Sequence, residues 1–342
     1  MPTNGSSLFV RLARAAVAAS ALVTSTVLAQ PTVVKVATIA PKGSIYHRVL
    51  QEVGEAYGRA SGGGARFVIY PDSIQGTEAD TVRRMRVGQL HASMLTVVGL
   101  TQIDRSVAAL QFMPMMFRSW DELDHVREKL RPELEAKLAA KGFVVLIWGE
   151  GGWVQFFTKE NIATPDAYKQ ARIFSWSGDI VQASVMKSQG FHPVSIPLAD
   201  ILPALETGMI DTVPVAPLWA LVGQFDRITR YMLRINWVPI VGATVMRRQT
   251  FDAMRPEARA ALRAAADQAT AKLRAHRARQ DAESIDAMKA RGLTVKPLTP
   301  ELEQAWRAVA EASWPQVRGT MVPAETFDKV QAILAAYREG RQ

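Results

Sequence analysis

Residues 33–70, VVKVATIAPKGSIYHRVLQEVGEAYGRASGGGARFVIY, decide the fold class of this chain. The apolar run at 33–39 predicts a strand. Apolar residues with helical spacing from Ile45 to Tyr57 predict a helix, which three consecutive glycines end. A second β-rich run follows at 65–70. The chain therefore opens with a strand, a helix and a strand, the repeating unit of α/β proteins.

The same alternation continues towards the C-terminus. Helices predicted after Thr77 and Ser119, two residues suited to N-caps, alternate with strands as far as 143–148. After a turn predicted at 149–152, the pattern restarts and alternates to residue 215. We therefore expect an α/β architecture with parallel sheets.

The last third of the chain is predicted to be helical. Pro256 suits the first turn of a helix that runs to Arg291, and the apolar stripe of this helix is narrow. A narrow stripe on so long a helix predicts that it lies across two bodies. Two further helices are expected at 300–317 and 323–339.

The first 29 residues have the layout of a secretory signal. Arg11 and Arg14 precede an uncharged apolar run at 15–27, and Ala29 is a small residue that a signal peptidase accepts. The run is too short to span the roughly 30 Å of a bilayer's hydrocarbon core. We expect residues 1–29 to be a signal peptide removed near Ala29, and the mature chain to be a soluble periplasmic protein.

Composition argues against several classes of function. The chain has no cysteine, which removes disulfides and thiolate nucleophiles, and its five histidines lack metal-ligand spacing. Its net charge of +9 is spread along helices with acidic residues between, so we expect no nucleic-acid partner. Nucleophile-elbow, P-loop and dinucleotide-binding motifs are also absent from the sequence, so we expect neither an enzyme nor a metal or cofactor.

Six segments of the sequence stand in a distinctive order and spacing. They are KVATIAPKGS at 35–44, GQLHA at 88–92, LQFMPMMF at 110–117, WGEGGW at 148–153, TPDAYK at 164–169 and GMID at 208–211. No single segment is decisive. Together they make the chain resemble the substrate-binding proteins of tripartite ATP-independent periplasmic (TRAP) transporters, the DctP family.

The resemblance implies a two-lobed periplasmic binding protein fold, type II-like, with a long lobe-spanning C-terminal helix. Residues 30–150 would form mainly lobe I and residues 151–248 mainly lobe II. The long helix and the C-terminal helices, within 249–342, would pack on both lobes. A small-molecule ligand would be enclosed between the lobes and delivered to the membrane subunits of a TRAP transporter.

The chain departs from the family where a ligand carboxylate is usually paired. Members that bind organic acids carry an arginine at the end of a segment that corresponds to residues 168–174, and this sequence has Phe174 there. An unpaired buried carboxylate is unfavourable, so we expect a neutral or largely apolar ligand, or a monocarboxylate. The alternatives are a C4-dicarboxylate or other organic acid held by Arg172, Arg234 or Lys42, and a ligand-sensing accessory protein.

Candidate ligand-binding residues come from strand ends, loops and aromatic side chains of both predicted lobes. Phe174 and Trp176 are the first choice, because strand alternation places them on one face together with Arg172. The full set is Ser44, Tyr46, Thr96, Trp148, Glu150, Trp153, Arg172, Phe174, Trp176, Pro214, Trp219 and Trp237.

Some of these candidates also have a purely structural interpretation. Ser44 is suited to cap the helix that follows it, and Thr96 is suited to core packing. Trp148 and Trp153 flank a glycine-rich segment, and both rings are large enough to belong to a core.

Overall fold

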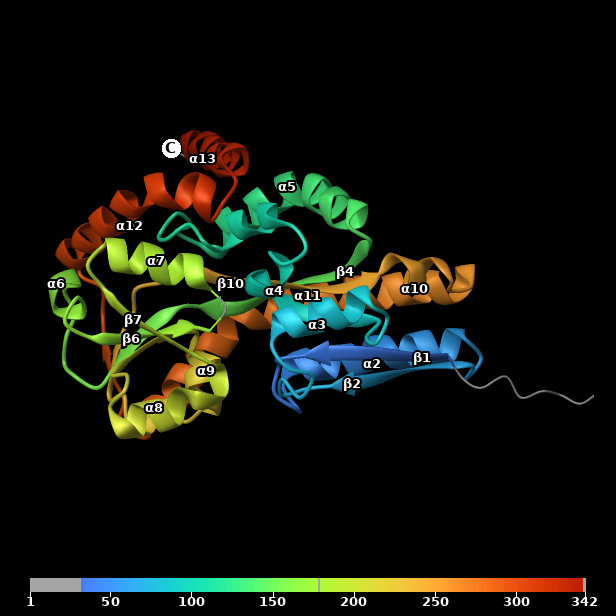
Figure 1. The fold of residues 1–342 in the computed structure, drawn as a ribbon, viewed down its shortest axis with the longest axis horizontal. Helices are drawn as coiled ribbons and strands as arrows, with labels where there is room; N and C mark the ends of the chain where they lie inside the picture. Colours follow the sequence, from blue (N-terminus) through green and yellow to red (C-terminus); the bar gives the residue numbers. More distant parts are fainter. Residues whose placement is uncertain (1–31, 178, 341–342) are drawn as a thin grey trace, which may run out of the picture.

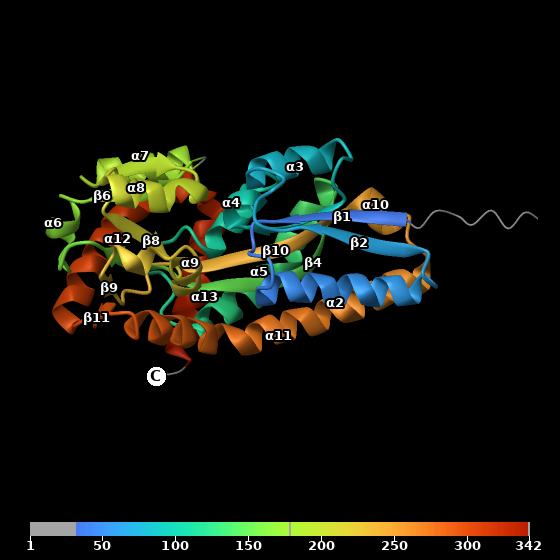
Figure 2. The same cartoon turned by 90° about the horizontal axis from the view of Figure 1, so that it is seen from below.

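A computed structural model of the chain describes residues 32–177 and 179–340 (Figure 1). The signal peptide predicted at 1–29 lies outside these residues. Two sheets form two lobes, which are joined by strands that pass between them and by one long helix (Figure 2). The two-lobed α/β fold predicted from the sequence is confirmed.

The first lobe is built on a five-stranded sheet with the order β2-β1-β3-β10-β4. β1 is parallel to β2 and β3, whereas β10 is antiparallel to both β3 and β4. The strands are β1 Thr32–Thr38, β2 Ala65–Tyr70, β3 Ala92–Thr96, β4 Phe143–Trp153 and β10 Pro239–Arg247. The last strand returns from the second half of the sequence, so the first lobe is not continuous in the chain.

Helices of the first lobe begin where the sequence offers caps. The Ser44 hydroxyl accepts a hydrogen bond from the His47 N–H at 3.3 Å, and Thr77 forms a complete capping box with Asp80. The helices are α2 Ile45–Ala60, α3 Glu78–Arg86, α4 Val97–Leu100, the 3-10 turn η1 Arg105–Leu110, α5 Trp120–Ala140 and α10 Arg248–Asp252.

The second lobe is built on a six-stranded sheet with the order β11-β9-β5-β8-β6-β7. β6 is parallel to β7 and β8, whereas β5 is antiparallel to β8 and β9. The strands are β5 Gln155–Thr158, β6 Arg172–Trp176, β7 His192–Ile196, β8 Thr212–Val215, β9 Tyr231–Leu233 and β11 Thr294–Lys296. The helices are α6 Pro165–Tyr168, α7 Ile180–Ser188, η2 Leu198–Asp200, α8 Ile201–Thr207, α9 Pro217–Val222 and η3 Phe225–Arg227.

Helix α11, Pro256–Lys289, runs for 34 residues beneath both lobes (Figure 2). Its buried Leu262 and Leu273 belong to an apolar cluster of the first lobe. Ile285 and Met288, further along the helix, belong to a cluster of the second lobe. The narrow apolar stripe therefore serves two cores in succession, as the sequence predicts for a helix that spans two bodies.

The C-terminal helices α12, Pro300–Thr320, and α13, Ala324–Glu339, pack on different lobes. α12 lies against α6 and α7 of the second lobe, whereas α13 lies against α5 of the first lobe (Figure 1). Arg338 on α13 donates to the Glu122 carboxylate on α5 at 2.8 Å. The chain end thus connects the lobes a second time.

Two expectations about the local structure are wrong. The predicted turn at 149–152 is part of β4, whose pairing with β10 continues past it. Glycines occur there because neighbours leave no space: a Cβ on Gly151 would lie 2.8 Å from the Ile240 side chain. The sheets are also mixed rather than parallel, because β5 and β10 run antiparallel to their neighbours.

Candidate functional site

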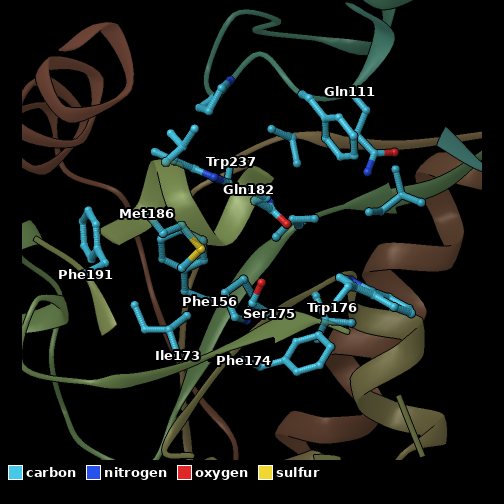
Figure 3. Close-up of a pocket in the computed structure, with 18 of the residues that line it drawn as sticks. Gln111, Phe156, Ile173, Phe174, Ser175, Trp176, Gln182, Met186, Phe191 and Trp237 are labelled. Carbon is cyan, nitrogen blue, oxygen red and sulfur yellow. The ribbon is translucent and has the colours of Figure 1, made fainter. Parts of the chain in front are cut away.

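A cavity of about 150 Å³ lies where strand ends from the two sheets converge (Figure 3). The first lobe contributes Ile39, just after β1, and Thr96, the last residue of β3. The second lobe contributes Trp176 at the end of β6 and Ala216 just after β8, together with side chains of α7 and α12. The carboxyl ends of parallel strands are the usual ligand position in α/β sheets.

The wall of this cavity carries no formal charge. Within the described part of the chain, none of the residues that line it is Lys, Arg, His, Asp or Glu. Burial raises the pKa of Tyr168, so the one phenol in the wall stays protonated and neutral. The polar groups offered to a ligand are hydroxyls, amides and indole N–H groups.

Phe174 and Trp176, the first-choice candidates from the sequence, both line the cavity. Their ring centroids lie 5.6 Å apart with the planes at 61°, an edge-to-face pair. Phe174 is 3% exposed and belongs to the core of the second lobe, whereas Trp176 is only partly buried. An aromatic ring therefore occupies the position that the resemblance gives to a carboxylate-binding arginine.

The cavity brings together half of the predicted site residues. They are Thr96, Phe174, Trp176, Pro214, Trp219 and Trp237.

A second cavity of about 60 Å³ adjoins the first and shares Thr96 and Trp219 with it. Two further candidates, Tyr46 and Glu150, line this smaller space. The Tyr46 hydroxyl donates to the Glu150 carbonyl at 2.8 Å.

The Glu150 carboxylate is a structural ion-pair partner. It is buried and pairs with the guanidinium groups of Arg127 and Arg277, and the latter lies 3.4 Å away. The same two arginines also bind Asp124, at 2.9 Å and 2.6 Å. This network ties β4 to α5 and α11, so the Glu150 charge is already compensated inside the protein.

Two predicted site residues line neither cavity and pack in the core of the first lobe. Trp148 is 3% exposed, and its indole N–H donates to the Glu135 carboxylate at 2.9 Å. Trp153 packs on Trp120 with ring centroids 4.9 Å apart. Both tryptophans are core residues of the first lobe.

Ser44 and Arg172 likewise line neither cavity. Ser44 caps α2. Arg172 begins β6, and its Nε donates to Asp211 at 3.0 Å on the exposed surface. Trp176 is four positions further along the strand, about 13 Å away, so Arg172 lies at the end of β6 remote from the cavity.

The other two cations considered for an acidic ligand are also outside the cavity wall. Lys42 and Arg234 are exposed, and neither lines the cavity. The structure therefore brings none of Lys42, Arg172 and Arg234 to the cavity.

Several residues that line the larger cavity were not among the predicted site residues. Ser175 is 2% exposed, and no hydrogen-bond partner for its Oγ lies in the described chain. Gln111 accepts the Val241 N–H at 3.0 Å through Oε1, which fixes its amide orientation and leaves Nε2 as a donor. Strand alternation assigns Ser175 to the face opposite Phe174 and Trp176, and Gln111 lies within the family segment at 110–117 without any sign of its role.

The arrangement defines a class: a two-lobed α/β protein with a small-molecule cavity between its lobes. Residues 36–319 match the DctP family model, described as bacterial extracellular solute-binding protein, family 7. The chain belongs to this family. It is a non-enzymatic, periplasmic solute-binding protein of the TRAP type, which binds a small molecule and delivers it to membrane subunits.

A curated relative and several solved structures are similar to the chain. The 2,3-diketo-L-gulonate-binding periplasmic protein YiaO of Escherichia coli (strain K12) is 25% identical over 267 residues, 76% of this chain and 78% of the relative. A TRAP periplasmic solute-binding protein from Desulfovibrio desulfuricans, with bound sn-glycerol-3-phosphate, has a TM-score of 0.81 at 19% identity, covering 90% of this chain and 97% of that chain.

A second solved relative comes from Xanthobacter autotrophicus Py2 and holds β-D-galacturonate; its TM-score is 0.80 at 18% identity, with 88% of this chain and 99% of that chain covered. A third solved relative, from Sulfurospirillum deleyianum, holds succinate. Its TM-score is 0.80 at 20% identity, and the match covers 89% of this chain and 99% of that chain. The ligands of these three solved relatives are acids.

Within 32–177 and 179–340, every helix is either too short or too polar to traverse a bilayer.

Proposed function

We propose that this protein captures an uncharged, largely apolar small organic molecule between its lobes and presents it to the membrane subunits of a TRAP transporter. The observation that supports this proposal is the charge-free wall of the 150 Å³ cavity. Phe174, which lines this wall, occupies the sequence position at which the resemblance places a carboxylate-binding arginine.

The energetics favour an uncharged ligand in such a wall. Moving an ionised carboxylate from water into an apolar site is strongly unfavourable unless a cation and hydrogen bonds replace its hydration. Hydroxyl and amide groups provide hydrogen bonds but no compensating charge. A neutral solute avoids this penalty and gains from contact with the aromatic wall.

The alternative is an organic acid, which the ligands of the solved relatives favour. Such an acid would need a cation that moves into the cavity on binding. The two proposals therefore differ in the charge of the ligand, which an experiment can vary at nearly constant shape.

Thermal unfolding with pairs of ligands that are similar in shape but differ in charge tests the proposal. The purified protein is melted with benzamide against benzoate, succinamide against succinate, and methyl galactoside against galacturonate. Neutral members should raise the melting temperature, because a ligand at a hundred times its Kd stabilises the folded state by about 2.7 kcal/mol. Stabilisation by the acids alone would contradict the proposal.

A further inference from the structure

Five aromatic residues from separate parts of the chain wall one end of the cavity. We call this group the aromatic chamber; it consists of Phe156, Tyr168, Phe191, Trp237 and Trp306, and all five line the cavity. Trp306, on α12, is the centre of the group. Its ring centroid lies 5.2 Å from those of Phe156 and Tyr168, 5.8 Å from Trp237 and 6.3 Å from Phe191.

Aromatic rings make up most of the chamber wall, which also carries the buried Tyr168 hydroxyl and the Trp237 indole N–H. The Trp306 indole N–H donates to the Ala163 carbonyl at 2.8 Å, so the polar edge of that ring is satisfied within the protein. Met186 on α7 adds a flexible thioether to the same space (Figure 3). Aromatic faces and a methionine sulfur favour a planar, polarisable apolar group.

One polar position lies between the chamber and Trp176. Figure 3 draws the oxygens of Ser175 and Gln182 towards the middle of the cavity, with Phe191 at one end and Trp176 at the other. The Ser175 hydroxyl is buried without a partner in the described structure, a condition that costs about 1–3 kcal/mol. A ligand group that donates to or accepts from this hydroxyl would remove that penalty.

The volume is sufficient for a single-ring ligand. A dry apolar cavity of about 150 Å³ in an engineered protein core accommodates benzene. The cavity here has about the same volume and an adjoining space of about 60 Å³, so it has room for one ring and a small substituent.

We propose that the solute is a single-ring aromatic compound with one uncharged hydrogen-bonding group, its ring in the aromatic chamber and its polar group at Ser175. This inference rests on the proposed function and narrows its substrate class. The aromatic wall would select the ring of the ligand by its shape. The Ser175 hydroxyl and the amides of Gln111 and Gln182 would form hydrogen bonds with its substituent.

The first test measures, by titration calorimetry on the full mature protein, the affinity of small compounds that carry the ring, the polar group or both. Benzamide and benzyl alcohol carry both ring and polar group, acetamide carries only the polar group, and methyl galactoside is neutral without an aromatic ring. The two ring compounds should bind at least tenfold more tightly than acetamide or methyl galactoside.

The second test uses variants with matched controls. Ser175→Ala should weaken benzamide binding about five-fold, as for one lost hydrogen bond, without lowering the melting temperature of the free protein. Ser93→Ala is the control: Ser93 is 1% exposed, and its hydroxyl donates to the Ala37 carbonyl at 3.0 Å in the first lobe. That variant should melt lower and bind benzamide as the unmodified protein does.

Filling the chamber gives an independent result. Met186→Trp should abolish benzamide binding, whereas Val181→Trp, at a 43% exposed position of α7 that does not line the cavity, should leave it unchanged.

The outcomes separate the inference from the proposed function. Equal binding of ring compounds and of neutral solutes without a ring, or unchanged benzamide affinity in both Ser175→Ala and Met186→Trp, would overturn the inference alone. Absence of binding by every neutral ring compound at millimolar concentration would also overturn it. Binding restricted to benzoate, succinate or galacturonate would overturn both.

Discussion

At the scale of single residues, Trp176 connects the fold to ligand binding. Its ring is partly buried, lines the cavity and packs edge-to-face on Phe174. The exposed part of the ring is available to a ligand, whereas Phe174 beneath it belongs to the core. Trp176 can therefore be truncated with little loss of core packing.

Trp176→Ala should weaken binding of a neutral ligand at least tenfold while lowering the melting temperature only slightly. Trp148→Ala is the matched control, since Trp148 is a buried tryptophan outside the cavity. Its removal should cost about 3–5 kcal/mol of stability and leave ligand affinity intact. Calorimetric titration and thermal melts check both variants, and a Trp176→Ala protein with full affinity would exclude Trp176 from the site.

At the scale of elements, the passage from β4 to β5 is buried against helix α11. Asp281 on α11 accepts the Trp153 N–H at 3.1 Å, where β4 ends. Gly152 has a φ of +99°, and a Cβ there would lie 2.4 Å from the Asp281 carboxylate. Only glycine fits this left-handed position beneath the carboxylate.

Burial raises the pKa of Asp281 to about 6 from its ordinary value of 3.8. Because the folded state holds this proton more tightly than the unfolded chain, the stabilising contribution exists at low pH and is lost as pH rises from about 4 to 6. The loss is at most about 3 kcal/mol, at 1.36 kcal/mol per pKa unit.

Asp281→Asn keeps an acceptor for the Trp153 N–H and removes the titration. The variant should melt higher than the unmodified protein at pH 7, and the difference should vanish near pH 4. Thermal melts from pH 4 to 7 measure this, and parallel curves for the two proteins would show that Asp281 does not titrate in this range.

Elements with a strong local pattern could be predicted from the sequence. The helix from Ile45 to Ala60 and the strands at 65–70 and 172–176 match the structure, because caps, spacing and glycines act over short distances. The structure of the segment 149–152 could not be predicted from the sequence. Its glycines are required by close packing against β10 and α11, which lie far away in the chain.

The cavity could be predicted only in part, for a related reason. Phe174 and Trp176 stood out because one strand carries both aromatic rings. Trp306 comes from α12, more than a hundred residues later, and reaches the cavity only through the packing of α12 on α6 and α7. Arg172 does not line the cavity, although it shares a strand with Trp176, because alternation gives the face of a strand but not which end lies near the cavity.

At the scale of the whole molecule, the two lobes are connected by β4, β10 and α11, and again by the pair α12 and α13. The cavity takes its wall from both lobes and from α12. Membership of the DctP family fixes the role of the protein as a TRAP-type binding protein. The uncharged wall then sets its proposed ligand apart from the acids bound by the solved relatives.

Mass spectrometry of the small molecule that the protein retains through purification tests the central claim most directly. The protein is denatured after gel filtration, and the released compound is identified in positive and negative ion modes. The account predicts a compound that carries no ionised group at pH 7. A uronate, a dicarboxylate or a phosphate ester released in stoichiometric amount would contradict it.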